Sequence, residues 1–513
     1  MLGADEPRYA QVAREMWTRG DWVTPTLGGQ VWFEKPALVY WTEMLAFSVF
    51  GVSEWSARLG VAIGGWLTVL LVGWTAGRVE QVEGGVELRG LQLTCAGVLA
   101  SCSGLIVFSR AVNFDVMIMA TITLALVCFM RAELAAPSSR RQWWMIGFYA
   151  GMGLSLLAKG LIGVVLPAGV VGLYYLLRRR RPTLWQLAPW GLLLTAAVAA
   201  VWYAPAAARH GWKFIDEFIV QHHFARYTSN KYQHPQRFYF YLPIMLLLVL
   251  PWTAFFISAL WRVRSWDWRA DGAAAKFRLL SLAWLLVPIG FFSLSGSKLP
   301  GYILPALPGA ALLVGDEVAR FQRGEGNLWV MRATGVLILA LALAGLAFAF
   351  QTGAIGRLCA LAIVVPPLIA GSVALIAARR RVLCVAVIVG AGLLTPVLIG
   401  ACALESLARR ESVRELLQTA DSRGYSESPI VNLHTIERTA EYYAAGRLRY
   451  ESSGHPVKFE GVYQVVEEIR RSGRPVLVFV PPEFLDQLTN DPRLKTEMLG
   501  DNGSVALVAA SSR

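Results

Sequence analysis

The chain has 513 residues, of which 55% are hydrophobic and only 16% are charged. A soluble protein of this length would carry about 25% charged residues, so the composition favours a polytopic membrane protein and argues against a soluble enzyme. The formal net charge of +13 would suggest nucleic acid as the partner of a soluble chain. Here the basic residues lie in short loops between apolar runs, so we expect no nucleic-acid partner.

The first 54 residues are more polar than those that follow and predict amphipathic helices in a loop at the membrane surface. Asp5, Glu6 and Arg8 lie among the first eight residues, and Glu34 and Lys35 follow in the stretch FEKPALVYW. An Asp directly before a helix is also an ordinary capping signal. Helix capping therefore explains Asp5 when that residue is considered alone.

Residues 55–402 contain about twelve apolar runs, each long enough to cross a hydrocarbon core of about 30 Å. They predict a mainly α, polytopic bundle of about 12 transmembrane helices. The runs are residues 55–78, 91–108, 115–132, 143–158, 161–177, 187–207, 238–261, 279–295, 299–315, 329–350, 357–377 and 382–402.

Basic clusters predict the orientation of this bundle. Arginines fill residues 178–181 and 379–381, and further clusters lie at residues 140–141 and 262–278. Once the twelve runs are threaded through a membrane, all of these clusters fall on one side, as the positive-inside rule requires of cytoplasmic loops. The opening segment, residues 108–115, 209–237 and 296–302, and everything after Cys402 then face the opposite side.

Unusual polar side chains gather on that opposite side. A single ionisable group near a bilayer is most simply a solvated loop charge or a satisfied pair, whereas a one-sided set marks a path for an anionic, membrane-embedded substrate. Besides those of the opening segment, the set contains Arg110, Asp115, His222, His223, Arg226, His234, Lys298 and Tyr302.

Residues 403–513 change to a soluble composition. Strand-like runs such as PVLVFV alternate with helical ones such as GVYQVVEEIRRS, which predicts a small, outward-facing α/β accessory domain. The segment has no phosphate loop, metal motif or nucleophile elbow.

The six cysteines of the chain all lie in or beside apolar runs without a CxxC pair, so they are most simply small core residues.

Several stretches resemble one family. The run DEPRYAQVAREMWTRGDWVTPTLGGQVWFEKPALVYW, followed by FGVSEWSARL, resembles the first extracytoplasmic loop of bacterial GT-C class membrane glycosyltransferases, above all the ArnT-like aminoarabinose transferases of lipid A. The resemblance continues in SRAVNFD, HHFARYTSNKYQHPQRFYFYLP and SKLPGYILPALPG, and it is weak in the last hundred or so residues. Protein O-mannosyltransferases are the next most similar group.

The resemblance implies a GT-C fold and transfer of a sugar from a polyprenyl-phosphate donor to lipid A or another envelope acceptor. The location implied is the bacterial inner membrane, with the active site facing the periplasm. In this family the opening loop follows a first transmembrane helix. We therefore expect an apolar span encoded upstream of Met1.

Breaking a glycosyl–phosphate bond leaves an anionic lipid phosphate that fixed positive charge must hold. The candidates for this role are Arg8, Lys35, Arg226 and Lys298, with the Tyr302 hydroxyl as a further donor. A lysine that extends to the membrane interface is a serious alternative for Lys298.

The acceptor needs a carboxylate to take its proton or to orient it, and Asp5 is the candidate. Asp5, Glu6 and Lys35 form the predicted catalytic set, with Asp5 kept ionised by Lys35 or Arg8. We expect Asp5, Lys35, Glu34 and His222 to line one cavity.

Glu34 and His222 could together bind a divalent cation, either zinc or magnesium or manganese. A hydrogen-bonded Glu–His pair is at least as good an explanation of these two residues.

Two other functions fit parts of the sequence. A protein O-mannosyltransferase-like enzyme would use the same donor class with a Ser or Thr acceptor, and the motifs do not discriminate against it. A transporter of lipid-linked sugars fits the number of spans but predicts mid-membrane polar groups and internal repeats. The polar residues lie on one face here and no clear repeat is present, so the transporter ranks last.

The orientation can be tested directly. Reporter fusions after Arg181 and after Arg410 should report opposite sides of the membrane, because the Arg loops are expected in the cytoplasm and the C-terminal segment in the periplasm. The same side for both fusions would remove the argument that the polar residues share one face.

Overall fold

The protein is described from a computed structural model that covers residue 1, residue 3 and residues 5–83, 90–136, 139–180, 182, 189–218, 236–451 and 454–513. The chain divides into two compact units. The mixed unit comprises Met1–Phe33, Tyr40–Leu59 and Cys402–Arg513, and the helical unit comprises Glu34–Val39 and Gly60–Ala401. The first and last parts of the chain therefore belong to the same unit, while domain boundaries at residues 54 and 402 stay a prediction.

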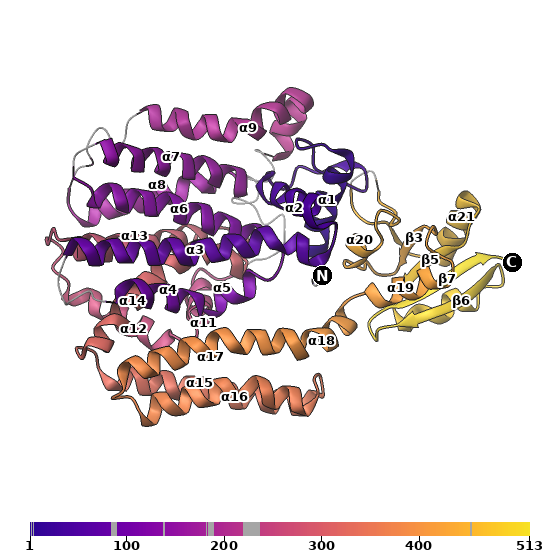
Figure 1. The fold of residues 1–513 in the computed structure, drawn as a ribbon. Coiled ribbons are helices and arrows are strands. Elements are labelled where there is room, and N and C mark those ends of the chain that lie inside the picture. The colour runs from indigo at the N-terminus through magenta and orange to yellow at the C-terminus, as the bar shows by residue number, and fades with distance from the viewer. Residues whose placement is uncertain are drawn as a thin grey trace. The chain divides into compact units, whose positions relative to one another are not determined.

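The helical unit is a bundle whose long helices run alongside one another (Figure 1). Its elements, in chain order, are α3 (Glu54–Glu83, here from Gly60 onward), α4 (Leu91–Ala100), α5 (Ser103–Phe108), α6 (Phe114–Leu134), α7 (Ser139–Lys159), α8 (Ile162–Leu177), α9 (Pro189–Phe214), α11 (Tyr241–Leu248), α12 (Thr253–Arg262), η4 (Val263–Ser265), α13 (Ala273–Ser293), η5 (Pro300–Ala306), α14 (Leu307–Arg323), α15 (Leu328–Thr352), α16 (Arg357–Ile376) and α17 (Arg381–Cys402).

Eight helices of the described residues are long and apolar enough to cross a membrane, or nine if the bent pair α11 and α12 counts as one span. The expected total of twelve is therefore not confirmed. Residues 91–108 form two short helices that break at Ser101 and Cys102, and α8 has only 16 residues. The run at residues 238–261 bends by 118° between α11 and α12, so one apolar stretch becomes two short helices.

Small residues let the helices of this unit approach closely, as in other membrane bundles. A Cβ on Gly151 of α7 would lie 3.0 Å from backbone and side-chain atoms of Ala125 on α6. A Cβ on Gly309 of α14 would lie 2.9 Å from the backbone of Leu285 on α13. Side chains larger than hydrogen are excluded there, so these glycines set the spacing of the bundle.

The mixed unit combines helices with a five-stranded sheet of order β4-β3-β5-β7-β6. Strand β3 is parallel to β4 and β5, whereas β7 is antiparallel to β5 and β6. The elements are α1 (Asp5–Arg19), β1 (Thr26–Leu27), β2 (Gln30–Val31), α2 (Leu38–Phe50, here from Tyr40), α18 (Leu404–Glu411), α19 (Arg414–Ser422), β3 (Ile430–Leu433), α20 (Ala440–Tyr443), β4 (Lys458–Phe459), α21 (Val462–Ser472), β5 (Val476–Val480), η6 (Pro482–Phe484), α22 (Leu485–Thr489), β6 (Leu494–Asp501) and β7 (Ala506–Ser512).

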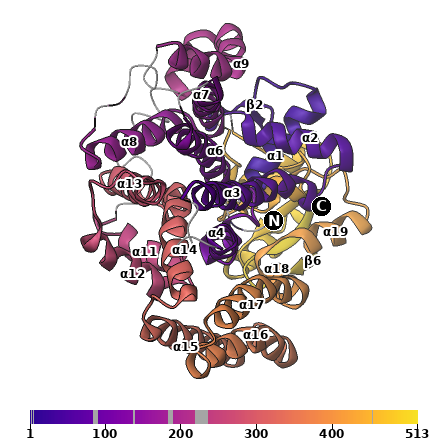
Figure 2. The same cartoon turned by 60° about the vertical axis from the view of Figure 1, so that its left-hand side comes forward.

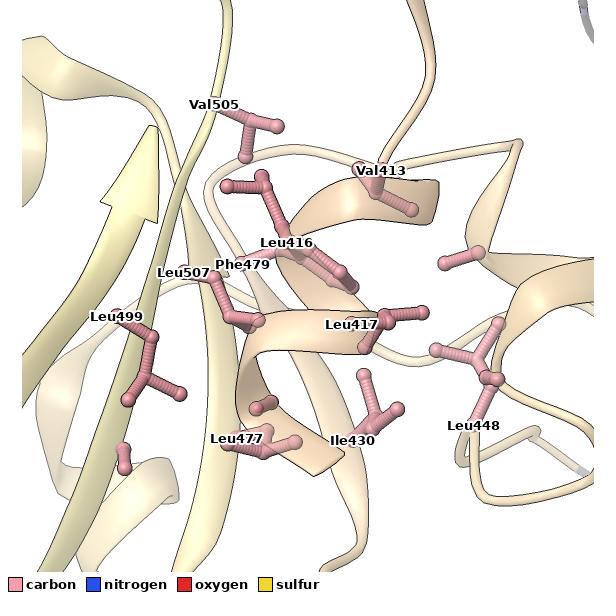
Figure 3. Close-up of a cluster of buried hydrophobic side chains, with 14 residues drawn as sticks. Val413, Leu416, Leu417, Ile430, Leu448, Leu477, Phe479, Leu499, Val505 and Leu507 are labelled. Atoms are coloured by element: carbon pink, nitrogen blue, oxygen red, sulfur yellow. The ribbon is translucent and has the colours of Figure 1, made fainter. Parts of the chain in front are cut away.

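Alternation along the central strand gives the sheet two apolar faces. Leu477 and Phe479 of β5 join a buried cluster with Leu416 and Leu417 of α19 (Figure 3). Val478, on the opposite face of the same strand, joins a second cluster with residues of α21. Because side chains of a strand alternate between faces, helices on both sides are needed to cover the sheet.

A tight hairpin near the start of the chain follows directly from its sequence. Gly28 and Gly29 have φ of 58° and 77°, which suits the two-residue turn that joins β1 to β2. The Glu15 carboxylate on α1 accepts hydrogen bonds from both glycine amides, at 2.8 and 3.1 Å. Gly28 also packs against the Tyr450 ring, where a Cβ would approach to 2.3 Å.

Four of the six cysteines, Cys95, Cys102, Cys128 and Cys384, are buried free thiols, as the sequence suggested. The same expectation was wrong for Cys359 and Cys402, which are disulfide-bonded. Disulfides persist in oxidising compartments. The apolar context of these two cysteines gave no sign of disulfide bonding in the sequence.

The sheet core offers a test of stability. Leu477→Ala removes a fully buried side chain from the central strand and should destabilise the fold by about 2.7 to 5 kcal/mol. The urea midpoint for proteolysis of the C-terminal segment, measured on the full-length protein in detergent, reports the change.

Met498→Ala is the matched control, because Met498 is 46% exposed on β6 and should change stability by about 0.5 kcal/mol or less. Equal losses for the two variants would contradict the assigned core.

Candidate active site

In the helical unit, the turn between α5 and α6 positions the first polar residue of the candidate site. Asn113 caps α6, since its Oδ1 accepts a hydrogen bond from the Val116 amide at 2.9 Å. The Asn113 Nδ2 donates to the carbonyls of Phe108 and Ala111 at 2.6 and 2.7 Å. Asn113 thus links the residues before the turn to the first turn of α6. Asp115 lies in that first turn, where the helix dipole favours a carboxylate.

Asp115 forms an ion pair with Lys159, the last residue of α7. The Lys159 ammonium also lies 4.6 Å from the centroid of the Tyr302 ring, within the range of a cation–π contact. Gly301 packs directly against this ion pair, because a Cβ at that position would lie 2.5 Å from the Asp115 carboxylate. The motifs SRAVNFD and SKLPGY, far apart in sequence, are therefore in contact.

Lys298 is a second cation of this unit, and only 6% of the residue is exposed. Its Nζ donates to the carbonyl oxygens of Ser295 and Gln236 at 2.6 and 3.1 Å. Burial and two internal hydrogen bonds contradict the alternative of a lysine extended to the interface. Both of these partners are neutral carbonyls, and no ion pair of Lys298 occurs among the described residues.

Glu34 and Lys35 pair with each other in the same unit. Lys35 Nζ lies 2.9 Å from Glu34 Oε1, and only 11% and 12% of the Lys35 and Glu34 side chains are exposed. A carboxylate and an ammonium are therefore held together in a largely buried place. An anion entering there would meet a cation whose position Glu34 already restrains.

In the mixed unit, Asp5 is the first residue of α1 and its side chain is 61% exposed. Arg8 lies between two carboxylates, 3.7 Å from both Asp5 Oδ1 and Glu441 Oε2. The pKa of Glu441 is raised because burial disfavours its charged form more than Arg8 and Arg438 favour it. Arg8 thus has the neighbour that the sequence predicted, together with a competing buried carboxylate.

Glu6 has a structural role in the fold. Its carboxylate accepts two hydrogen bonds from Arg58, at 2.7 Å from Nε and 3.0 Å from Nη2, and the residue is 4% exposed. A buried bidentate pair of this kind ties α1 to the start of α3. The structure does not support Glu6 as a group that touches substrate.

Glu43 of α2 is completely buried, and neither carboxylate oxygen has a hydrogen-bond partner in the described part of the chain. Burial raises its pKa well above the ordinary value of 4.5, and the nearby charge of Glu6 raises it further. Burial therefore favours the neutral carboxylic-acid form of Glu43.

Two predicted site residues, His222 and Arg226, lie outside the described residues, as do His223 and His234. Across the residues that the structure does describe, no group of three His, Cys, Asp or Glu side chains is placed to hold a metal ion. Asp5 and Lys35 belong to different units. The expected convergence of Asp5, Lys35, Glu34 and His222 stays a prediction.

Sequence reasoning missed three charged residues that organise these sites: Lys159, Arg58 and Glu43. Lys159 had a usable signal, because a lone Lys between two apolar runs falls on the same side as Asp115 when the spans are threaded. Glu43 interrupts the apolar stretch LVYWTEMLAFSVF, which also marks it as unusual. Arg58 carried no such signal, since an Arg near a helix start is ordinary.

Comparisons with known proteins identify relatives of the chain. Residues 2–260 match the family described as dolichyl-phosphate-mannose-protein mannosyltransferase. An undecaprenyl phosphate-alpha-4-amino-4-deoxy-L-arabinose arabinosyl transferase of Pseudomonas aeruginosa is 35% identical over 352 residues, and the match covers 67% of this chain. The transferase of the same name from Aeromonas salmonicida is 31% identical over 346 residues, covering 66% of this chain. The matched region spans 60% of the length of each relative.

Among solved structures, ArnT from Cupriavidus metallidurans bound to undecaprenyl phosphate aligns with a TM-score of 0.79 at 24% identity. The alignment covers 99% of this chain and 94% of the other. The apo form of the same protein aligns with a TM-score of 0.78 at 23% identity. These matches show that the chain has the same mainly helical fold.

The buried acid predicts a pH dependence. With a folded pKa above 4.5, Glu43 stabilises the fold at low pH, and this contribution is lost as the pH rises from about 4.5 toward the raised value. Glu43→Gln keeps the shape without an ionisable proton. Its melting temperature should therefore match that of the native chain near pH 4.5 and exceed it increasingly toward pH 7.5.

Glu427→Gln, at an exposed position, is the control and should follow the native chain at every pH. A constant difference between the Glu43→Gln variant and the native chain across this range would show that Glu43 is not a buried neutral acid.

Proposed function

The chain belongs to the dolichyl-phosphate-mannose-protein mannosyltransferase family, and we propose that it is an integral-membrane glycosyltransferase that moves a sugar from a polyprenyl-phosphate carrier to lipid A or another envelope acceptor. The observation that carries the proposal is the 35% identity over 352 residues with an undecaprenyl phosphate-aminoarabinose arabinosyl transferase. The proposed place of the reaction is the periplasmic face of a bacterial inner membrane.

In the proposed reaction an acceptor oxygen attacks the anomeric carbon of the sugar, and the bond from that carbon to the carrier phosphate oxygen breaks. The carrier leaves as an anionic polyprenyl phosphate, and its developing charge needs fixed cations. Lys298, held by neutral carbonyls, and Lys35 are the proposed partners of that phosphate. Arg226, Arg8 and the Tyr302 hydroxyl complete the proposed set.

The Asp115–Lys159 pair is proposed to position this set. Lys159 contacts the face of the Tyr302 ring, and Asp115 holds Lys159. Removal of either charge would leave the other unpaired, so the direction of the Tyr302 hydroxyl depends on both.

Asp5 is proposed to orient the acceptor and to take its proton where the acceptor is a hydroxyl. Its high exposure leaves the carboxylate accessible, and the Arg8 guanidinium lies 3.7 Å away. An ionised phosphate acceptor has no proton to lose, and Asp5 then acts by orientation alone.

A divalent cation at Glu34 and His222 also belongs to the proposal. Glu34 could supply one carboxylate ligand, although its Oε1 already accepts a hydrogen bond from Lys35. Zinc at such a site would polarise a phosphate oxygen as a Lewis acid.

The family description supports a second candidate, transfer of mannose to a protein hydroxyl. The two candidates share the donor class and differ in the acceptor. Mass spectrometry of lipid A and of envelope glycoproteins from a strain lacking the gene separates them.

Substitution tests the proposed roles of Asp5 and Lys35. Asp5→Asn keeps the shape of the side chain and removes its charge, and Lys35→Ala removes a partner of the leaving phosphate. Each should lower the transfer rate about 100-fold or more, a loss of at least about 2.7 kcal/mol of transition-state stabilisation by analogy with single oxyanion donors. Transfer to lipid A in a complemented null strain is the measurement.

Asp486→Asn, an exposed substitution on α22, is the matched control and should transfer as the native protein does. All variants should reach the membrane in equal amounts. Full transfer by the Asp5→Asn protein would leave Asp5 only a structural role at the start of α1.

A further inference from the structure

An apolar groove of about 400 Å³ crosses the outer part of the helical unit. Helices α15, α16 and α17, which lie side by side in both ribbon views, form one wall (Figure 1, Figure 2). The region around α5 and the start of the α11–α12 bend forms the other. The lining includes Ile338, Gly345, Val364, Pro367, Ile388 and Pro396.

The inner end of the groove is closed by a helix contact. A Cβ on Gly335 of α15 would lie 2.8 Å from the Gly371 carbonyl of α16, so the two backbones approach most closely just below the groove. Ile338 and Ile388 are buried above this contact. Toward their outer ends, alanines and glycines such as Ala342 and Gly345 line the opening.

Three residues of the lining carry a hydroxyl, Ser101, Ser103 and Thr395, and the two serines use theirs within the protein. The Ser101 hydroxyl donates to the Gly97 carbonyl and accepts from the Trp252 indole N–H. The Ser103 hydroxyl donates to the Leu247 carbonyl. Apart from the Thr395 hydroxyl, the side chains that remain present carbon, which suits a hydrocarbon chain better than a sugar or a peptide.

The length of the groove matches half a bilayer. Residues 338–349 of α15 span about 16 Å at about 1.5 Å per residue, close to half of a hydrocarbon core of about 30 Å. With the orientation that the Arg loops predict, this half is the outer leaflet.

A cationic side chain, Arg110, lies at the end of the groove that is farther from the Gly335–Gly371 contact. The exposed Arg110 extends from the turn before α6 and donates from Nη2 to the Pro396 carbonyl at 2.9 Å. Pro396 lines the groove, so a lipid whose chain fills the groove would place its headgroup near this guanidinium. The guanidinium complements a phosphate.

We propose that this groove binds one acyl chain of the anionic lipid acceptor, with Arg110 facing the acceptor's phosphate. The inference rests on the proposed transfer to an envelope lipid and adds where that lipid is held. A polyprenyl chain fits less well, because it is longer than one leaflet and the Gly335–Gly371 contact ends the groove at mid-membrane. The Asp115 turn joins Arg110 to the candidate active site, so the bound headgroup lies beside it.

The test fills the groove. Gly345→Leu adds a side chain at a position where a Cβ meets nothing within 4 Å, and should displace part of the bound chain. The KM for lipid A should rise about tenfold, because about two buried methylene contacts are lost. The KM for the polyprenyl-linked donor should stay unchanged. Both are measured with the full-length protein in nanodiscs.

Gly390→Leu is the matched control, since Gly390 is also a helical glycine with nothing within 4 Å of a Cβ but does not line the groove. It should leave both KM values unchanged. A rise in the donor KM alone would assign the groove to the polyprenyl chain, and unchanged values would reduce it to a site for bulk phospholipid. Either result overturns the proposal.

Direct binding of radiolabelled lipid A to the same variants separates this inference from the proposed function. Binding by the native chain that weakens in Gly345→Leu, without any transfer by either protein, would refute the transferase and keep the groove. Transfer with equal binding by both proteins would keep the transferase and refute the groove.

Discussion

The ion pair between Asp115 and Lys159 is the interaction on which one end of the helical unit depends. It joins the first residues of α6 to the last residue of α7, and Gly301 packs directly against its carboxylate. Each charge also lies at the helix end whose dipole favours it. At the other end of α6, Glu133 accepts hydrogen bonds from Tyr174 and Tyr175. A single apolar helix is thus fixed at both ends by carboxylates, where a low dielectric makes each unpaired charge costly.

Pairing of charges also organises the mixed unit, with a different result. Glu6 and Arg58 are fully matched by two hydrogen bonds. Arg8, in contrast, is shared between Asp5 and the buried Glu441 at equal distances. A guanidinium divided between two carboxylates holds neither tightly, and the Asp5 side chain stays 61% exposed. The matched pair supports the fold, and the proposed chemistry of Asp5 uses the group whose charges are shared.

The proposed chemistry and the groove both depend on which polar groups are already hydrogen-bonded within the protein. Lys298 donates hydrogen bonds to two backbone carbonyl oxygens, which carry no formal charge. The groove stays apolar because its serine hydroxyls are bonded inside the protein. An anionic headgroup and a hydrocarbon chain would therefore each meet a surface of matching polarity. A lipid substrate needs both at neighbouring places, and α5 with the turn that follows it connects them.

Local sequence determined much of this protein. The apolar runs predict a helical bundle, and the strand-like run PVLVFV predicts the strand that the structure places at β5. These features depend on residues that are neighbours in the chain. Sequence also pointed to Asp115 and Lys298 as unusual polar groups at one membrane face.

Tertiary structure decided the partners of the charged residues. Asp115 pairs with a lysine 44 positions away, and Glu6 pairs with an arginine 52 positions away. It also decided which apolar runs are broken or short, and that Glu43 is buried with no hydrogen-bond partner among the described residues. A charged residue is visible in a sequence, but its partner is set by the packing of helices that are distant along the chain. Only that packing determines whether the charged residue supports the fold or stays available to a substrate.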